Sequence, residues 1–398
     1  MKLNIVVVQP TSLCNLDCRY CYVPDRRNKA RMSDEVLATV IRKVLTSHLV
    51  DRQVQFLWHA GEPLLAGKDF YRRVIELVNQ LNHRQVHVEQ AIQTNATLID
   101  DGWCDLFKTH SFKVGVSIDG PAFLHDAQRR NWGGGHSHVK AMQGYRMLRK
   151  HGIETGAICV LTKESLKHPE AIIEFFVENG FTSIAFNAEE TENQNLRSSL
   201  DDNLEEVITD YRRFMGTVFD LQQKKYPHLR IRELTRIFSV LAIKRRNPDY
   251  YRIAPEIPPF GMITIQRNGD ISPYCPEFAG AISPEYNNFT IGNILTNDID
   301  DLPNAPMFLK ISQDVEKSIS MCAASCRYFD ICGSAPLSNK YSENKTLLST
   351  ETVSCKLTYQ VLSEVLLEKA SLQRSVPPLS STEIASSEVP LAPALRQT

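Results

Sequence analysis

The sequence lacks the features that mark three broad classes of protein. Its 45 Lys and Arg residues nearly balance 46 Asp and Glu residues, and the net charge of −1 gives no electrostatic case for nucleic acid as the main partner. No apolar run approaches the length that spans a bilayer. The first residues, Met-Lys-Leu-Asn, show no signal peptide. We therefore expect a cytoplasmic protein with reduced thiols and with neither a nucleic-acid nor a membrane partner.

Cysteine, in contrast, is plentiful. The 398 residues are 42% hydrophobic and 23% charged, which is ordinary for a globular protein of two or more domains, but they include ten cysteines. Most of these cysteines occur in motif-like places. Cys104 and Cys159 stand alone, and we expect both to be buried packing residues.

Three cysteines near the start carry the strongest signal. Cys14, Cys18 and Cys21 form a C-x3-C-x2-C pattern. Three thiolates on one loop can hold three irons of a [4Fe–4S] cube and leave the fourth iron open to a substrate or cofactor. Zinc is the alternative, but its usual spacings are C-x2-C or C-x4-C joined by a second ligand pair. The spacing favours the cluster.

The first half of the chain alternates between short apolar runs and stretches with helical periodicity. Strands are predicted at 3–8, 54–58, 86–92, 113–118, 155–160 and 183–186, and helices at 33–45, 69–81, 137–150 and 169–179. Ser33 is the predicted N-cap of the first helix. Six strand–helix units in order predict an α/β fold with a parallel sheet. We expect a partial (β/α)6 barrel, in which function gathers at the carboxyl ends of the strands.

A second region follows this barrel. A long amphipathic helix at 201–225 is predicted to lead out of it, and Asn268-Gly269 between strands at 262–266 and 271–274 indicates a hairpin. A further helix is predicted at 358–370. We expect three parts, which are a barrel with its bridging helix at 1–230, a small cysteine-rich α+β domain at 231–370, and a disordered tail at 371–398.

Short polar motifs follow the predicted strands. In His59-Ala60-Gly61-Glu62-Pro63, glycine permits close backbone approach and the carboxylate of Glu62 can accept hydrogen bonds from an ammonium group. The next two strands end in Gln93-Thr94-Asn95-Ala96 and Ser117-Ile118-Asp119-Gly120-Pro121, whose polar side chains suit hydroxyl recognition. Each segment alone also fits a turn or a helix cap, but their order along the strands favours a site.

Taken in this order, the motifs resemble those of radical S-adenosylmethionine (radical SAM) enzymes. The cysteine triplet, with Tyr20 before its last cysteine, is similar to the family's cluster-binding signature. The segment 59–63 resembles the family's GGEP motif, with Ala60 in place of the first glycine. This resemblance implies that Gly61, Glu62 and Pro63 bind the amino group of S-adenosylmethionine.

The same resemblance implies further cofactor contacts. Asn95 lies in a segment similar to the family's Thr-Asn-Gly, and Ser117 and Asp119 lie in a region that is near the cofactor ribose in family members. Arg129, which follows His125-Asp126, matches a family arginine near the cofactor carboxylate, although it could also be a surface cation. The implied cofactors are S-adenosylmethionine and the [4Fe–4S] cluster that binds it.

Four more thiolates come late in the chain, from Cys322, Cys326, Cys332 and Cys355. They can hold a second cluster or, alternatively, a structural zinc ion. The pattern resembles the SPASM extension of peptide-modifying radical SAM enzymes, which carries auxiliary [4Fe–4S] clusters. Family members often have two further cysteines where this chain has Phe260-Gly261 and Pro336, which leaves Cys275 as the remaining ligand of the other auxiliary cluster. One or two auxiliary clusters are therefore implied.

Segments 186–192, 333–344 and 349–352 resemble the SPASM maturases that form cyclophane cross-links in ribosomal peptides, including those with glycine-rich-repeat precursors. The resemblance covers about residues 1–370. It implies that a 5′-deoxyadenosyl radical removes hydrogen from a Cβ of a precursor peptide, whose carbon radical then attacks an aromatic ring. It also implies an electron donor such as flavodoxin or ferredoxin. The proposed proton acceptors are Glu189, Glu190, Glu192 and Glu277, although an acidic run also fits a solvated loop.

Two alternatives stay open. One is a radical SAM maturase of another kind, which forms a thioether or oxidises Cys or Ser to formylglycine in sulfatases. Sulfatase-maturing relatives usually carry an aspartate directly after the cysteine that corresponds to Cys275, and Pro276 stands there in this chain. The other alternative is a non-catalytic iron–sulfur or zinc protein that acts as a redox sensor or binding module.

Overall fold

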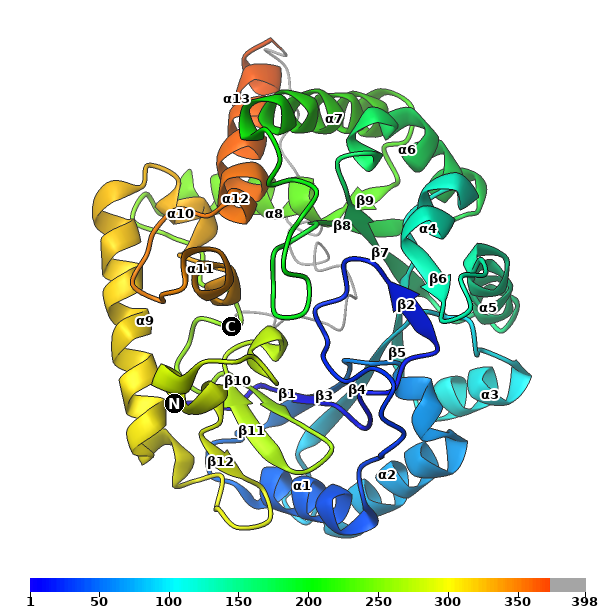
Figure 1. Ribbon diagram of the computed structural model, residues 1–398, viewed down its shortest axis with the longest axis vertical. Coiled ribbons are helices and arrows are strands. Elements are labelled where there is room, and N and C mark those ends of the chain that lie inside the picture. The colour runs from blue at the N-terminus through cyan, green and yellow to red at the C-terminus, as the bar shows by residue number, and fades with distance from the viewer. Residues whose placement is uncertain (373–398) are drawn as a thin grey trace.

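The computed structural model of the chain describes residues 1–372. A single ten-stranded sheet curves through the molecule in the order β12-β11-β10-β1-β3-β4-β5-β7-β8-β9 (Figure 1). The six neighbours from β1 to β8 pair in parallel. They are the six strands expected from the sequence, so the partial (β/α)6 barrel is confirmed. The disordered tail predicted at 371–398 lies outside the described residues, apart from its first two positions.

The barrel strands are β1 (Ile5–Val8), β3 (Gln53–Trp58), β4 (His87–Thr94), β5 (Lys113–Ser117), β7 (Thr155–Leu161), β8 (Ser183–Ala188) and the short β9 (Arg230–Ile231). The helices around them are α1 (Asp34–Thr46), α2 (Lys68–Leu81), α3 (Asp101–Thr109), α4 (Ala122–Gln128), α5 (His138–Lys150), α6 (Pro169–Glu178), α7 (Leu204–Lys224) and α8 (Arg232–Lys244). Of these helices, α3, α4 and α8 were not predicted.

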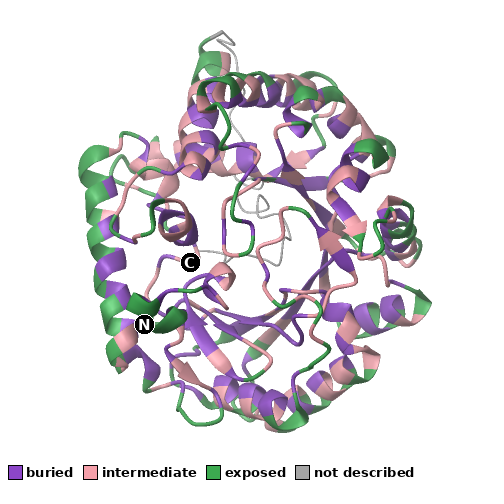
Figure 2. Ribbon diagram, viewed as in Figure 1, coloured by how far each residue is buried: buried purple, intermediate pink, exposed green. Residues whose placement is uncertain are grey.

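Helices cover the outer side of the sheet because each presents an apolar stripe to it (Figure 2). The first of them shows how the local sequence does this. Ser33 caps α1 as predicted, since its side chain accepts a hydrogen bond from the backbone N–H of Val36. The six apolar residues that the helical period places on one face are all buried, namely Val36, Leu37, Val40, Ile41, Val44 and Leu45.

The predicted hairpin is present, and its position beside the first barrel strand could not be predicted from the sequence. It consists of β10 (Met262–Ile265) and β11 (Asp270–Pro273), to which β12 (Gly292–Asn293) is added. Strand β10 pairs in parallel with β1, and Ile5 lies opposite Met262. The hairpin thereby covers the hydrogen-bonding edge of β1, a strand whose four residues are all buried. The division at residues 230 and 370 stays a prediction.

The late part of the chain is more helical than expected. It contains α9 (Pro306–Ser325), α10 (Phe329–Cys332), α11 (Leu337–Asn344), α12 (Val353–Cys355) and α13 (Leu362–Leu372). Helix α13, which overlaps the helix predicted at 358–370, packs beside α7 (Figure 1). Its Lys369 forms an ion pair of 2.5 Å with Asp220 of α7. The chain thus returns to the barrel after the last cysteine.

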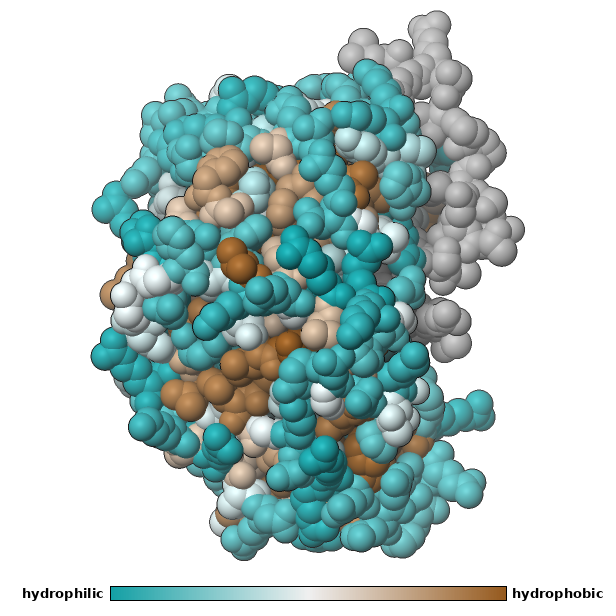
Figure 3. All heavy atoms as spheres, turned by 90° about the vertical axis from the view of Figure 1, so that its right-hand side faces the viewer, coloured by the Kyte–Doolittle hydropathy of each residue, from teal (hydrophilic) through white to brown (hydrophobic). Residues whose placement is uncertain are grey.

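The face of the molecule shown in Figure 3 is mostly hydrophilic, with separate hydrophobic patches between the polar side chains. Among the described residues, no helix combines the length and the apolar character that a membrane span requires.

Candidate functional site

The loop that follows β1 leads directly into the cysteine triplet and is held by the segment after β3. The backbone N–H of Glu62 donates to the carbonyl of Leu13 at 2.8 Å. Gly61 has a φ of +74°, and a Cβ placed on it would lie 2.6 Å from the carbonyl oxygen of Thr11. Only glycine allows this close approach at this backbone conformation. Ala60 also has a positive φ, of 67°, so the alanine in place of the family's first glycine adopts the left-handed region too.

Glu62 is a buried carboxylate with three hydrogen-bond donors. Its Oε1 accepts from the Thr94 hydroxyl at 2.7 Å and from the Leu64 backbone N–H at 3.0 Å, and its Oε2 accepts from the Asn95 backbone N–H at 2.8 Å. Burial raises the pKa of Glu62 to about 7, and these hydrogen bonds oppose the shift. The carboxylate is therefore fixed in place with acceptor capacity to spare on Oε2, which suits it to an ammonium group.

Asn95 connects the end of β4 to the cysteine loop. Its Nδ2 donates to Oδ1 of Asn15 at 2.9 Å and lies 4.0 Å from Sγ of Cys14. One strand further along the sheet, the hydroxyl of Ser117 accepts a hydrogen bond from Gln93 at 2.9 Å. The carboxyl ends of β4 and β5 thus place both predicted residues on the side of the sheet that carries the cysteine loop.

Asp119, Arg129 and Tyr20 form one buried cluster. The short strands β2 (Leu16–Cys18) and β6 (Arg129–Asn131) pair antiparallel, and Cys18 lies opposite Arg129. Arg129 binds Asp119 with two hydrogen bonds, of 2.9 and 3.2 Å, and the hydroxyl of Tyr20 also donates to Asp119. The guanidinium lies 5.3 Å from the centre of the Tyr20 ring. Arg129 is therefore a buried residue and not the surface cation that the sequence left open.

The three early cysteines fit a cluster better than a zinc ion. Cys14, Cys18 and Cys21 are free thiols, buried or half-buried, and the backbone N–H of Leu16 donates to Sγ of Cys14 at 3.4 Å. Zinc needs its sulfur ligands about 2.3 Å from one point. Within residues 1–372, no group of three or more His, Cys, Asp or Glu side chains is placed to hold a single metal ion. A cube of four irons and four sulfides, in contrast, takes one iron per thiolate.

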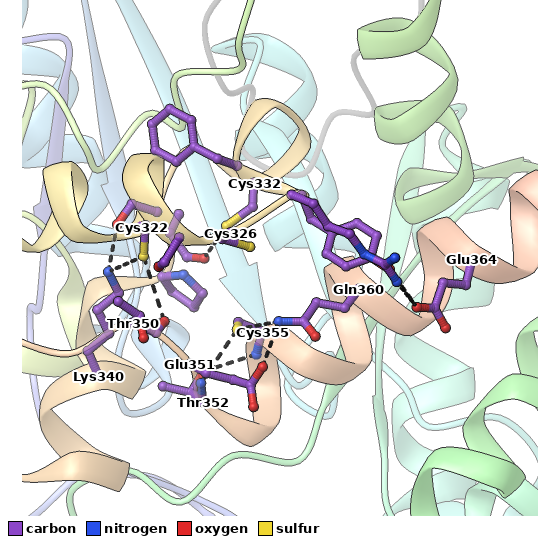
Figure 4. Close-up of a pocket in the computed structure, with 17 residues that line it drawn as sticks. Cys322, Cys326, Cys332, Lys340, Thr350, Glu351, Thr352, Cys355, Gln360 and Glu364 are labelled. Atoms are coloured by element: carbon purple, nitrogen blue, oxygen red, sulfur yellow. Dashed lines mark hydrogen bonds and ion pairs between the residues drawn. The ribbon is translucent and has the colours of Figure 1, made fainter.

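The four late cysteines line one cavity of about 410 Å³ (Figure 4). Cys322 lies on α9, Cys326 directly after it, Cys332 at the end of α10 and Cys355 at the end of α12. Donors surround the sulfurs, since Nζ of Lys340 lies 3.3 Å from Cys322 and the backbone N–H of Thr352 lies 3.5 Å from Cys355. A cavity of this size with thiolates on several walls fits a second [4Fe–4S] cluster. As in the early site, no three of the described side chains of these types are placed to hold a single zinc ion.

The proposed proton acceptors fall into two groups. The carboxylate of Glu189 is bound by the backbone N–H of Ser199 at 3.1 Å and by its hydroxyl, so this residue stabilises the loop after β8. Glu190 and Glu277, in contrast, line a second cavity of about 260 Å³ together with Cys275. Burial, and after it repulsion from Glu190, raises the pKa of Glu277 to about 8. Burial and the charges of Glu190 and Glu277 also raise the pKa of the buried Glu192.

This second cavity adjoins the cavity of the late cysteines. Pro336 lines it and the cavity of the late cysteines as well. Burial, and after it the charge of Glu277, raises the pKa of Tyr22, which directly follows Cys21. The carboxylate-lined cavity is therefore a direct neighbour of the cavity that the late cysteines line.

Residues 8–176 match the radical SAM superfamily. The chain is also 36% identical over 370 residues to an uncharacterized protein of Synechocystis sp., and the alignment covers 92% of this chain and 91% of that one. The chain belongs to the radical SAM superfamily. It is an enzyme whose cofactors are S-adenosylmethionine and a [4Fe–4S] cluster, as the motifs implied.

Several other relatives of this radical SAM enzyme are anaerobic sulfatase-maturating enzymes. It is 39% identical over 180 residues to a serine-type anaerobic sulfatase-maturating enzyme of Bacteroides thetaiotaomicron, and the aligned part spans 43% of that protein. The solved structures that share its fold include two with bound ligands. Native anSMEcpe with bound AdoMet has a TM-score of 0.75 at 22% identity and covers 94% of this chain and 100% of its own. Streptococcus suis SuiB bound to the precursor peptide SuiA has a TM-score of 0.62 at 18% identity, over 89% and 76%.

Three residues of the site had no sequence signal. Arg232 and Arg236 on α8 line the second cavity, and Lys340 on α11 lines the late one. Arg232 donates to the backbone carbonyl of Phe186 at 2.9 Å, and Arg236 donates to the hydroxyl of Tyr359 at 3.1 Å. Basic residues are common in helices and most of them lie on the surface. The sequence therefore does not mark these three as residues that line a cavity.

Proposed function

We propose that this enzyme modifies a ribosomally made precursor peptide and joins an aromatic ring to a Cβ of the same peptide in a cyclophane. The observation that carries the proposal is the second cavity, which adjoins the cavity of the late cysteines and is lined by Glu190, Glu277, Arg232 and Arg236. A cavity of about 260 Å³ accommodates an amino-acid side chain together with part of its backbone. We assign it to the modified segment of the peptide.

Cross-link formation removes a hydrogen atom from Cβ and then a proton and an electron from the ring. When bound, S-adenosylmethionine and the clusters supply the radical that takes the hydrogen atom and the acceptor for the electron. The protein must supply the base. Glu277 and Glu190 are the candidates because both line the cavity, whereas Glu189 is bound to Ser199. A carboxylate whose pKa is raised to about 8 is well matched to taking up a proton near neutral pH.

The remaining residues of the early site position the cofactor. We propose that Glu62, Gly61 and Pro63 bind its amino group, that Asn95, Ser117 and Asp119 contact its ribose side, and that Tyr20 and Arg129 line the same region. The double hydrogen bond to Asp119 orients Arg129, so that its remaining N–H donors face in one direction. Rigid placement of this kind decides which hydrogen of the peptide is removed.

Formylglycine formation is the second candidate function. It is supported by the 39% identity to a serine-type sulfatase-maturating enzyme over 180 residues. Thioether formation is a further possibility of the same class. Mass alone does not separate these products, because a cyclophane, a thioether and a formylglycine made from serine each correspond to the loss of two hydrogens.

The test is co-expression of the enzyme with a short precursor peptide encoded beside it, followed by tandem mass spectrometry. We expect a peptide lighter by two hydrogens that gives no backbone fragments between an aromatic residue and the modified residue. It should not react with a hydroxylamine probe for aldehydes. A product that reacts with this probe would replace the cyclophane with formylglycine, and fragmentation that identifies a carbon–sulfur bond would replace it with a thioether.

A matched control distinguishes catalysis from binding. The Glu277→Gln variant keeps the size of the side chain but cannot take up a proton at the carboxylate. We expect this variant to cleave S-adenosylmethionine to 5′-deoxyadenosine in the presence of dithionite and to lose most of the cross-linked product. Full product formation by the variant would remove Glu277 as the base.

A further inference from the structure

We propose that Lys340 is a buried counter-charge for the late cysteine group, and that it raises the reduction potential of the cluster bound there. This inference rests on the proposed function, in which the late cysteines hold an electron acceptor. Lys340 lies on α11, and its side chain reaches into the wall of the 410 Å³ cavity (Figure 4). It is 3% exposed, which is exceptional for a lysine.

The three donors of the Lys340 ammonium group meet three acceptors. Nζ lies 2.7 Å from Oγ of Ser318, 2.6 Å from Oγ of Ser334 and 3.3 Å from Sγ of Cys322. Ser318 and Cys322 are one turn apart on α9, whereas Ser334 comes from the turn after α10. Lysine has three donors and no acceptor, so this environment satisfies it completely. The sulfur of a predicted cluster ligand is one of the three partners.

No carboxylate neutralises this charge in residues 1–372, where Lys340 forms no ion pair. The other charged residues that line the cavity are paired. Glu351 forms an ion pair of 2.7 Å with Lys356, and Glu364 forms one of 2.8 Å with Arg327. Lys340 therefore contributes the one uncompensated charge among the described residues of this cavity wall.

Burying an ammonium group is unfavourable unless a partner compensates for the lost water. Two serine hydroxyls replace part of the hydration but carry no net charge. Four thiolates around an iron–sulfur cube carry net negative charge, and reduction of the cube by one electron makes it more negative. A fixed positive charge in hydrogen-bond contact with one thiolate stabilises the reduced state more than the oxidised state. The potential therefore rises, which suits a cluster that accepts an electron from the substrate.

The experiment measures the late cluster alone, in the full chain. Replacement of Cys14, Cys18 and Cys21 by alanine removes the other cluster site and changes no residue that lines the 410 Å³ cavity. In this background we compare Lys340→Met, which removes the charge, with Lys340→Arg, which keeps it. Lys345→Met is the matched control, because Lys345 is exposed at the end of the same helix and its Nζ donates to the carbonyl of Ser342 at 2.7 Å. Iron and sulfide are determined, and the midpoint potential is measured by titration with detection by electron paramagnetic resonance.

We expect Lys340→Met to lower the midpoint potential by at least about 59 mV, a tenfold change in a one-electron equilibrium. Lys340→Arg and Lys345→Met should stay within a small fraction of that shift. An unchanged potential in Lys340→Met with full iron content would overturn the inference and leave the proposed function intact. If Lys340→Met loses the cluster, retention by Lys340→Arg supports the role of the charge, and loss by both refutes it. If the background protein itself binds no iron or sulfide, the late cluster is refuted together with the electron acceptor of the proposed function.

Discussion

Gly61 offers the sharpest test of how the cofactor loop is built. The Gly61→Ala substitution adds one methyl group at a φ of +74°. Its Cβ would lie 2.6 Å from the carbonyl oxygen of Thr11, 2.9 Å from that of Leu13 and 2.9 Å from the backbone carbon of Ser12. These are backbone atoms of the segment between β1 and Cys14. They cannot rotate away as a side chain can, so the loop that carries the first cysteine must shift.

The cost has two parts. A non-glycine residue in the left-handed region costs about 1–2 kcal/mol. Forcing an additional methyl group into a filled space typically costs about 1–3 kcal/mol more. Gly61→Ala should therefore lower the free energy of unfolding by about 2–5 kcal/mol. Gly152 is the matched control, because its φ is +72° and nothing lies within 4 Å of a Cβ built on it. Gly152→Ala should cost only the first part, about 1–2 kcal/mol.

Urea denaturation of the metal-free proteins, followed by circular dichroism, measures both values under the same conditions. Iron content after anaerobic reconstitution and binding of S-adenosylmethionine, measured by equilibrium dialysis, then report on the loop itself. We expect Gly61→Ala to lose cofactor binding and Gly152→Ala to retain it. Equal losses of stability in the two variants, with cofactor binding intact in both, would show that the close approach of the two loops does not hold the site together.

Three further predictions concern buried charges. Asp119→Ala should lower the free energy of unfolding by about 3–5 kcal/mol, because it leaves Arg129 buried without its partner, and urea denaturation measures this loss. Glu62→Gln should weaken the binding of S-adenosylmethionine at least about tenfold at unchanged iron content, because it removes the negative charge that faces the ammonium group. The new side-chain NH2 group would also face one of the donors that now bind Glu62, which should cost the folded protein about 1–3 kcal/mol. The third concerns pH. The pKa of Glu277 is about 8 in the folded protein and near its ordinary value of 4.5 when unfolded, so the folded state holds the additional proton between these values. The free energy of unfolding should therefore decrease as the pH rises from about 4.5 to 8, and Glu277→Gln should flatten that decrease in urea titrations between pH 5 and 9. A slope identical to that of the wild type would contradict the assignment.

Most of the barrel could be predicted from local patterns. The six parallel strands of the barrel are apolar runs separated by stretches with helical periodicity, namely β1, β3, β4, β5, β7 and β8. Such an alternation of strands and helices is typical of a parallel sheet covered by helices. The helices that were not predicted show the limit of this reasoning. Helix α9 carries Cys322, yet four of its 20 residues are Ser and its apolar stripe is weak, so its burial depends on what packs against it.

The sequence by itself determined which chemistry is available, because a triplet of cysteines on one loop and the motifs after the strands are local features that need no distant partner. The tertiary structure alone decided which charges meet. Cys18 faces Arg129 through a two-stranded ribbon, Glu277 comes to lie near Glu190, and Lys340 reaches Cys322 across two helices. These pairs are separated by many residues along the chain, and their contacts follow from how the sheet closes and how the late helices pack on it. Spacing along a sequence carries no information about contacts of that kind.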